Sequence, residues 1–459
     1  MVLSLPYIIA ATCAGTLIEW YDFYVYLFLQ STVAAQFYNG TESATTIIWL
    51  ATYAIGFIVR PIGALLFGYL GDIYGRKVTF MASLLMMGLA TTLCGCLPTK
   101  DQIGSAAGII LIILRILQGL AIGGEYGAAV AYIAEHAPAN KKGAYTCVLQ
   151  VMATFGLSLA LASCLIFRAV LSAGDWSTFG WRFPFLLSFL LIAISLYARS
   201  KLLESPVFAQ AKEDGEIAPS RFTKSAFKPA NIWTILVAII GTCMGQGVLA
   251  QVSQAYPLTF ITGLGVPLVP AYTILLVPCL LACPFFALFG YLSDKYGRKI
   301  FLVTGVTLAA ILTYPCYLGI YSFRPFENNK PSSPYRDAYS PAGMSFCIWI
   351  LVMCAAISYG PLAAYLSELF PTNIRFTGTA ACYHIGVGAL GGITGVIAVS
   401  VTSATGNIYG GLFYPIAVCS VCAVFGFVFL PETNGRNLNT MEDSKIQAET
   451  SAIPEKLAA

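Results

Sequence analysis

The most regular feature of this sequence is a series of long apolar stretches separated by short polar ones. A helix needs about 20 apolar residues to cross the hydrocarbon core of a bilayer, and twelve windows of the chain meet that length. We therefore predict an all-α membrane protein with twelve transmembrane helices. Their approximate limits are 7–36, 44–70, 77–97, 103–134, 146–170, 183–203, 231–262, 268–293, 299–321, 342–367, 378–402 and 409–430.

A polar stretch at 204–230 divides these windows into two groups of six. The sequence thus predicts an N-terminal bundle at 1–203, a connector at 204–230, a C-terminal bundle at 231–431 and a tail at 432–459. Lys and Arg are concentrated in the connector, the tail and alternate loops. Because basic loops are retained on the cytoplasmic side, both termini, the connector and the tail are predicted to be cytoplasmic.

Composition supports a chain embedded in lipid. Hydrophobic residues make up 58% of the 459 positions and charged residues 10%, whereas soluble domains average roughly half and about a quarter. The net charge of +4 is scattered along the chain, so no nucleic acid partner is expected. The first apolar stretch is long, contains Glu19 and Asp22 and lacks a basic leader, which predicts a retained helix rather than a signal peptide.

The cysteines do not indicate a disulfide framework or a metal site. All 14 lie in apolar segments, as small buried hydrophobic residues do. Cys419 and Cys422 form a CxxC, but the only histidines are His136 and His384, and a zinc site needs four ligands at characteristic spacings. We expect neither a metal nor a cofactor.

Three short segments recur in the two halves. GYLGDIYGRK at 68–77 is nearly repeated as GYLSDKYGRK at 290–299, AEHAPANKKG at 134–143 corresponds to SELFPTNIRF at 367–376, and LLESP near Glu204 corresponds to LPETN near Glu432. The spacing between the copies is nearly constant, and each follows an apolar window. This pattern predicts two parallel six-helix bundles related by an axis along the membrane normal.

The ordered motifs resemble the major facilitator superfamily, and within it the metabolite:proton symporters, which include carriers of 2-oxoglutarate, citrate, shikimate and proline or betaine. The motifs are GTLIEWYDFYVY (15–26), VRPIGALLFGYLGDIYGRK (59–77), LRILQGLAIGGEYGAAVAYIAEHAP (114–138), GWRFPF (180–185) and ELFPTNIRFTG (368–378). The resemblance implies two pseudo-symmetric bundles, proton symport by alternating access, a monomer in membrane lipid and a place in a bacterial inner membrane.

Five charged residues lie inside predicted spans: Glu19, Asp22, Arg60, Arg115 and Glu125. Each costs roughly 2.5 to 3.5 kcal/mol at mid-bilayer, so such groups usually face a cavity or one another. Three acids face two arginines, and a lone buried charge is prohibitive. We predict that the five surround one central, water-filled chamber and that one acid holds a proton during part of the cycle.

Two interpretations of these charges stay open. Asp22 and Arg60 could form an architectural ion pair that holds the first bundle together. Alternatively, Glu125 or Asp22, with Glu19 as a third candidate, carries the proton, while Arg115 or Arg60 binds an anionic substrate or tunes the acid. The resemblance favours a coupling role for Arg115 and Glu125.

Neutral polar residues complete the predicted substrate site. Buried amides need partners, which a ligand, water or a neighbouring helix could supply, and His384 could equally be satisfied internally. The candidates are Gln118, Tyr126, Gln246, Gln251, Gln254, Tyr256, Tyr359, Tyr383 and His384. Glycines near Glu125, together with Gly241 and Gly245, are interpreted as close helix contacts.

The repeated loops carry Asp72 with Arg76, and Asp294 with Arg298. Their basic residues suit anchoring on the cytoplasmic side. The resemblance implies in addition that these loops hold the two bundles together at that side. We predict a cytoplasmic gate formed by these four residues.

The two buried arginines favour a substrate with a carboxylate, such as a dicarboxylate, taken up together with protons. A rival substrate is a zwitterion such as proline or betaine, for which Trp20, Tyr21 and Tyr126 could form a cation-binding wall. A membrane-embedded enzyme would need a nucleophile with a base, or a metal cluster, at depth, and the spans offer none. A non-transporting sensor has no appended soluble domain to support it.

Overall fold

The structure is a computed structural model, and it describes residues 5–74, 76–200, 229–324, 339–370 and 375–436. Within these ranges the regular structure is entirely helical. The side chains at 71–77, which include Asp72 and Arg76, lie outside this description. So does most of the connector predicted at 204–230 and of the tail predicted at 432–459, and the domain limits stay a prediction.

We call residues 5–200 the first half and residues 229–436 the second half. The first half contains α1 (Leu5–Phe28), α2 (Gln30–Phe37), α3 (Glu42–Ile58), α4 (Arg60–Tyr74), α5 (Arg76–Cys96), α6 (Lys100–Ile103), α7 (Ala106–Gly123), α8 (Tyr126–His136), α9 (Lys142–Val170), α10 (Ala173–Asp175), the π-helix η1 (Trp176–Gly180) and α11 (Arg182–Ser200).

The second half contains α14 (Pro229–Ala238), the π-helix η2 (Ile239–Cys243), α15 (Met244–Ala250), the π-helix η3 (Gln251–Ala255), α16 (Tyr256–Gly263), α17 (Leu268–Tyr296), α18 (Arg298–Ser322), α19 (Pro341–Leu369), α20 (Arg375–Cys382), the π-helix η5 (Tyr383–Leu390), α21 (Thr394–Thr405), the short 3₁₀ helix η6 (Gly410–Leu412) and α22 (Phe413–Phe429).

The apolar windows coincide with these helices. Among the described residues, nine helical segments are long and apolar enough to cross a membrane, and the pair Ala173–Gly180 and Arg182–Tyr197, bent by 52°, makes a tenth. The two other predicted windows fall on α1 with α2 and on α5. The all-helical fold is confirmed, while the count of twelve membrane crossings stays a prediction.

Several predicted spans are broken. The window at 7–36 divides at Leu29, between α1 and α2, and the window at 44–70 divides at Val59, between α3 and α4. Pro61 sits in the first turn of α4, where its missing N–H leaves no hydrogen bond unmade. The window at 103–134 divides at 124–125, between α7 and α8. Apolar periodicity does not report such breaks, because the chain stays apolar through them.

Glycines bring α3 and α4 against α7. A Cβ on Gly119 would lie 2.2 Å from the carbonyl oxygen of Gly56, and one on Gly123 would lie 2.1 Å from that of Arg60. No larger residue fits these contacts, so the packing interpretation of the glycines is confirmed here. The close approach holds Arg60 beside the helix that carries Arg115.

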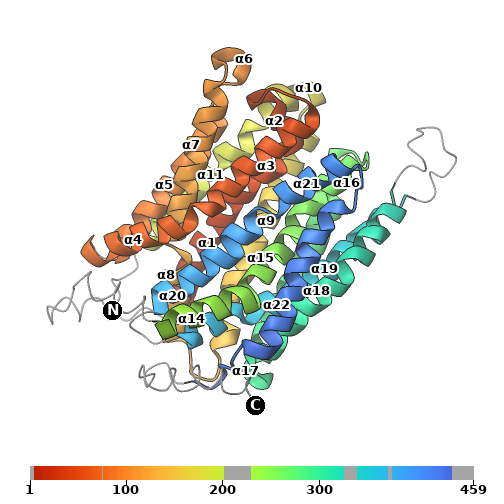
Figure 1. The fold of residues 1–459 in the computed structure, drawn as a ribbon. Coiled ribbons are helices and arrows are strands. Elements are labelled where there is room, and N and C mark those ends of the chain that lie inside the picture. Colours follow the sequence, from red (N-terminus) through yellow and green to blue (C-terminus); the bar gives the residue numbers. More distant parts are fainter. Residues whose placement is uncertain (1–4, 75, 201–228, 325–338, 371–374, 437–459) are drawn as a thin grey trace.

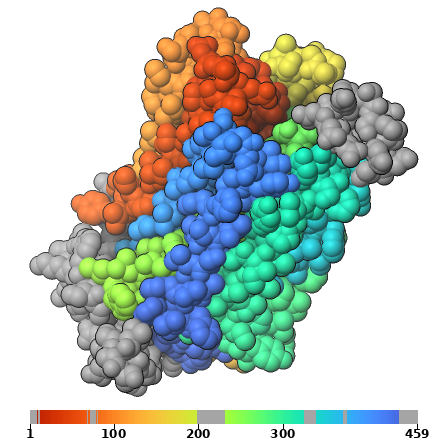
Figure 2. All heavy atoms as spheres, turned by 45° about the vertical axis from the view of Figure 1, so that its right-hand side comes forward, coloured from red at the N-terminus to blue at the C-terminus, as the bar shows by residue number. Residues whose placement is uncertain are grey.

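The two halves form one bundle with distinct ends (Figure 1). At the upper end in that view lie α2, α6, α10 and α16, and at the lower end lie the last turns of α17 and the start of α14. We call the upper one the Gln30 end and the lower one the Arg298 end. The halves meet where α9 packs on α17 and α19, α8 on α20, and α3 on α21. Figure 2 shows the blue α21 lying beside the red first half.

Candidate functional site

Asp22, on α1, is buried inside the first half. Its side chain is 1% exposed, and its polar neighbours are Thr91 of α5, Ser188 of α11 and Arg115 of α7. Neither carboxyl oxygen accepts a hydrogen bond from the residues that the structure describes. A buried carboxylate without donors is costly, whereas a protonated carboxyl group is much less so. Asp22 can therefore hold a proton here.

Arg115 is the cation next to Asp22. Its guanidinium carbon lies 3.9 Å from the ring centroid of Tyr26, and its Nη2 donates to Sγ of Cys94 at 3.8 Å. Nε and Nη1 have no hydrogen-bond partner in the described part of the chain. Gln118 donates from Nε2 to the hydroxyl of Thr91 at 2.5 Å. We call Asp22, Thr91, Arg115, Gln118 and Ser188 the Asp22 pocket, and every member belongs to the first half.

Arg60 lies instead at the boundary between the halves. Its guanidinium carbon is 4.1 Å from the ring centroid of Phe57, 4.4 Å from that of Phe23 and 5.5 Å from that of Trp20. Its Cδ would lie 3.7 Å from a Cβ on Gly388 of η5, in the second half. Arg60 is 1% exposed, and none of its three guanidinium nitrogens has a hydrogen-bond partner among the described residues.

Four of the five buried charges thus form two separate pairs rather than one chamber. Asp22 has Arg115 as its charged neighbour, and Arg60 has Glu19. Asp22 and Arg60 make no hydrogen bond with each other, so the alternative of an architectural Asp22–Arg60 pair is wrong. Glu125 is buried at the break between α7 and α8. The single chamber failed as a prediction because depth along a helix does not say which way each side chain points.

A tyrosine stack crosses the boundary near Arg60. The rings of Tyr126 of α8 and Tyr383 of η5 lie face to face, with centroids 3.4 Å apart and an interplanar angle of 11°. Gln150 of α9 donates to the hydroxyl of Tyr126 at 3.0 Å. The hydroxyls of Tyr359 and Tyr383 share a hydrogen bond. His384 meets both stacked rings edge-on, at 6.4 and 5.4 Å. We call Arg60, Tyr126, Tyr359, Tyr383 and His384 the boundary site.

The predicted amides occupy three different surroundings. Gln246, fully buried on α15, accepts a hydrogen bond from Ser358, and its Nε2 has no partner within the described ranges. Gln251 lies on η3 and faces Tyr53 of α3 across the boundary. Gln254 is also on η3 and is 6% exposed. π-Helical turns are frequent at functional sites, and η3 and η5 carry several predicted site residues.

At the Arg298 end, Asp294 ties the halves together, and Arg298 holds Asp294 in place. The carboxylate of Asp294 accepts hydrogen bonds at 2.8 Å from the backbone N–H groups of Gly143 and Ala144, at the start of α9. Arg298 donates to Asp294 at 2.6 Å and to Glu368 at 3.1 Å. An acid at a helix N-terminus is favoured by the helix dipole. Asp294 therefore links α17 to the first turn of α9.

Two ion pairs cross the boundary at this end, and their residues are not among those predicted for the gate. Nζ of Lys142 lies 4.0 Å from Glu368, and Arg375 donates to Glu135 at 3.0 Å. Glu135 and Lys142 lie in the segment 134–143, which corresponds to the segment 367–376 that contains Glu368 and Arg375. The pairs therefore cross reciprocally between repeat copies. The internal repeat of these two segments is the sequence feature from which the ion pairs could have been predicted.

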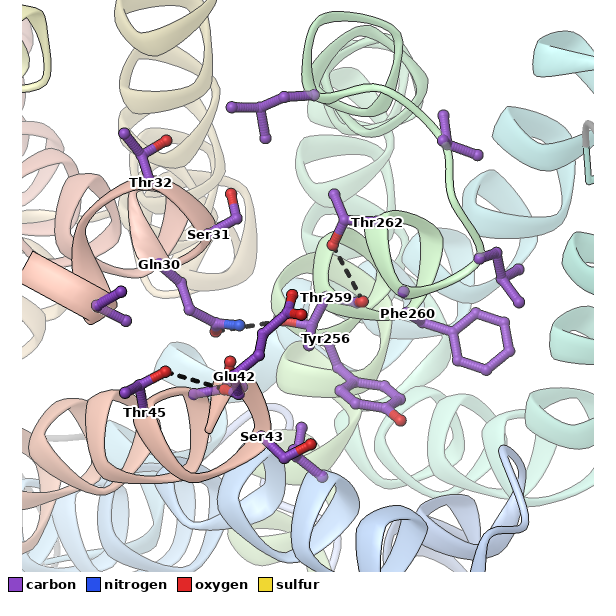
Figure 3. A pocket seen from close by; sticks show the side chains of 18 of the residues that line it. Gln30, Ser31, Thr32, Glu42, Ser43, Thr45, Tyr256, Thr259, Phe260 and Thr262 are labelled. Atoms are coloured by element: carbon purple, nitrogen blue, oxygen red, sulfur yellow. Dashed lines mark hydrogen bonds between the residues drawn. The ribbon is translucent and has the colours of Figure 1, made fainter. Parts of the chain in front are cut away.

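At the Gln30 end the boundary opens into a hollow of about 850 Å³. Figure 3 shows Gln30 and Glu42 of the first half pointing toward Thr259 and Tyr256 of the second half. The hydroxyl of Thr259 lies 3.5 Å from Oε1 of Gln30. The rest of the lining is rich in hydroxyl groups: Ser31, Thr32, Ser43, Thr45, Thr46, Ser177, Thr262 and Thr402.

The hollow stops short of the buried charges. Tyr256, at its inner edge, is 5% exposed, while Arg60 is 1% and His384 0% exposed. Below the hollow, Tyr272 of α17 donates to the carbonyl oxygen of Phe28 at 2.7 Å. That carbonyl is available because α1 ends at Phe28, and the last carbonyl groups of a helix have no partner within it. The boundary site is therefore closed at both ends in this structure.

The predicted aromatic wall for a cationic substrate does not assemble. Tyr21 points into the first half and donates to the carbonyl oxygen of Pro184 at 2.6 Å. Tyr126 stacks on Tyr383, and Trp20 lies against Arg60. The three side chains therefore face different neighbours. No group of three or more His, Cys, Asp or Glu residues suited to a metal occurs in the described part.

A polar boundary between two sets of apolar helices, closed at one end by ion pairs and hollowed at the other, defines an integral multi-pass membrane transporter. The proton:xylose symporter XylE of Escherichia coli, bound to 6-bromo-6-deoxy-D-glucose, has the same fold: the TM-score is 0.76 at 20% identity, over 97% of this chain and 98% of XylE. This fold is that of the major facilitator superfamily.

The family follows from the sequence comparison. The model of the sugar (and other) transporter family matches residues 7–228 and again 216–444. The chain belongs to this family, and its function is transport rather than catalysis. The inner membrane metabolite transport protein YhjE of Escherichia coli is 33% identical over 82% of this chain and 83% of its own. A proline/betaine transporter of Staphylococcus haemolyticus, provisionally so named, is 31% identical over 93% of this chain and 88% of its own.

Proposed function

We propose that this transporter couples proton entry to the uptake of a small organic acid, such as a dicarboxylate, by alternating access. The observation that carries the proposal is the Asp22 pocket. It holds a buried carboxyl group whose oxygens accept no well-formed hydrogen bond among the described residues, beside a fully buried arginine. A proton on Asp22 removes the cost of a bare carboxylate, and Arg115 offsets the charge when the proton leaves.

The substrate binds at the boundary, where both bundles can contact it. Arg60 supplies the charge that favours a carboxylate, and Tyr126, Tyr359, Tyr383 and His384 surround it. The predicted amides Gln246, Gln251 and Gln254, with Tyr256 toward the hollow, are the remaining candidates. Arg115 and Gln118, predicted as substrate ligands, act in coupling instead, because their neighbours all lie in the first half. Glu19, beside Arg60, and Glu125 stay candidates for the proton path.

The cycle alternates between the two ends. The Arg298 end is cytoplasmic in this proposal, with both termini on that side, in agreement with the basic loops. Its gate comprises Asp294 and Arg298 and, by the internal repeat, Asp72 and Arg76. The bundles at 1–203 and 231–431 rock about the boundary, in the inner membrane of a bacterium and as a monomer. The bacterial relatives, and the inner-membrane name of YhjE, support this location.

A zwitterionic substrate such as proline or betaine is the second candidate, favoured by the name of the staphylococcal relative. The two candidates differ in what Arg60 does. An organic acid leaves a negative charge for Arg60 to meet, whereas a zwitterion also needs a place for its cation. The aromatic wall predicted for that cation is not assembled, and the ring of Trp20 already faces the Arg60 guanidinium.

Proteoliposome counterflow tests the proposal. The purified carrier is loaded in turn with succinate, 2-oxoglutarate, citrate, proline and glycine betaine, and exchange is measured with and without an inward proton gradient. We expect exchange of at least one acid, and its accumulation only with the gradient. Exchange restricted to proline or betaine would mean that the substrate is a zwitterion and not an organic acid. Accumulation that is the same with and without the proton gradient would contradict the proposed proton coupling.

A further inference from the structure

We propose that one carboxylate of the substrate bridges Arg60 of the first half and His384 of the second, so that His384 is a specificity-determining residue of the boundary site. The inference rests on the proposed function. It adds to that function how the substrate carboxylate is held and which residue of the second half contacts it. Its starting point is that both side chains are fully buried. The three guanidinium nitrogens of Arg60 have no hydrogen-bond partner among the described residues, and neither ring nitrogen of His384 makes a well-formed hydrogen bond there, although the backbone of Gly123 lies beside the imidazole.

The surroundings of Arg60 restrict how a ligand approaches. The rings of Phe57 and Phe23 lie 4.1 and 4.4 Å from its guanidinium carbon. A ring at that distance shields the guanidinium from that side, and the N–H groups point outward within the guanidinium plane. A carboxylate can accept two parallel N–H bonds in that plane. The pocket therefore favours a planar carboxylate over a tetrahedral sulfonate, whose third oxygen would be brought toward the rings.

His384 provides the matching donor from η5. It meets the rings of Tyr126 and Tyr383 edge-on, and Arg60 is the charged group that acts on it. A neutral imidazole offers one N–H donor. Buried polar groups are normally hydrogen-bonded, so two unmet donors facing one boundary from opposite halves call for an acceptor between them. A quaternary ammonium offers no acceptor, and a carboxylate offers two oxygens.

The placement of the two anchors has a mechanical consequence. Arg60 begins α4, and His384 lies on η5, whose Gly388 meets the Arg60 side chain. A carboxylate held by both joins the halves at their centre, where each half alone provides only part of the site. His384 should thus set how tightly the substrate binds, while proton coupling stays with the Asp22 pocket.

Counterflow kinetics of His384 variants test this. The acid with the fastest wild-type exchange among succinate, 2-oxoglutarate and citrate serves as the probe. For His384→Leu we expect KM to rise roughly tenfold to a hundredfold, the range of one lost hydrogen bond to a charged group, with dependence on the proton gradient retained. His384→Asn keeps a donor and should fall between. The matched control is the other histidine: His136→Leu, on an exposed helix end, should leave KM unchanged.

Competition on the wild-type protein provides a measurement that needs no variant. Sulfoacetate, which keeps one carboxylate, should compete, whereas ethanedisulfonate, which has none, should not. A KM of His384→Leu within twofold of wild type, or equal competition by ethanedisulfonate and succinate, overturns the bridge. If His384→Leu does not yield folded protein, His384→Asn and the competition series decide. If the wild-type protein exchanges no acid at all, the proposed organic acid substrate is wrong. This outcome differs from a failure of the His384 bridge, in which acids are still exchanged.

Discussion

Arg115 and Arg60 are both buried arginines of the first half, yet they lie in different surroundings. Every neighbour described for Arg115, from Tyr26 and Cys94 to Asp22, belongs to the first half. Arg60 reaches Gly388 of the second half. In the proposed rocking of the bundles, the surroundings of Arg115 would move with it, whereas those of Arg60 would change. A charge inside one bundle suits proton storage, and a charge at the boundary suits substrate sensing.

The largest expected effect separates these roles at Asp22. Asp22→Asn removes the titratable group but keeps its shape, so proton-driven accumulation should fall about a hundredfold or more, as when a group acting in proton transfer is lost. Counterflow exchange should persist, because Arg60 and the boundary site are untouched. The exposed Asp175→Asn serves as control. Wild-type accumulation by Asp22→Asn would place coupling elsewhere, with Glu19 and Glu125 next in line.

The second effect concerns the reciprocal ion pairs at the Arg298 end. Side chains of Glu368 and Glu135 are 1% and 28% exposed. Glu368→Gln removes the buried counter-charge that Arg298 and Lys142 share, so that Arg298 keeps only Asp294. It should destabilise the closed end by about 3 kcal/mol, the lower end of the range for a broken buried pair. Its matched control is the repeat-related Glu135→Gln, which should cost about 1 kcal/mol or less, as partly exposed pairs do.

Alkylation of a cysteine placed at Ala144, in a background without reactive cysteines, measures the opening of this end. We expect fast labelling in Glu368→Gln and nearly wild-type labelling in Glu135→Gln. Equal labelling rates in the two variants would mean that the more buried ion pair does not contribute more to closing this end.

A smaller effect is expected from Asp294→Asn. The substitution weakens two hydrogen bonds to the N–H groups of Gly143 and Ala144, and bonds to a charged group are worth about 1.5–3 kcal/mol each. Part of that is retained by the amide oxygen, so inward-facing conformers should increase several-fold in the same labelling assay. Asp72→Asn probes the repeat-related position. An unaltered labelling rate in Asp294→Asn would contradict a latch.

The smallest effect is expected at Tyr272. Tyr272→Phe deletes the cross-half bond to the carbonyl oxygen of Phe28 and should cost about 1 kcal/mol. Since this contact lies below the hollow, its loss should favour opening of the Gln30 end and modestly raise labelling of a cysteine placed at Thr259. Lower labelling there would mean that the bond does not help to close this end.

The sequence by itself determined the helical membrane class, the approximate helix limits and the two-fold repeat, because apolar run length and recurring loop motifs are local properties. It also placed five charges at depth and marked Asp294 and Arg298. It could not show which of those charged side chains face one another, since a shift of one residue turns a side chain by about 100° around a helix. Only tertiary packing decided that Arg115 faces Asp22 and that Arg60 crosses to η5. The glycine contacts between α4 and α7 and the π-turns of the second half set those directions, and both depend on helices far apart in the chain.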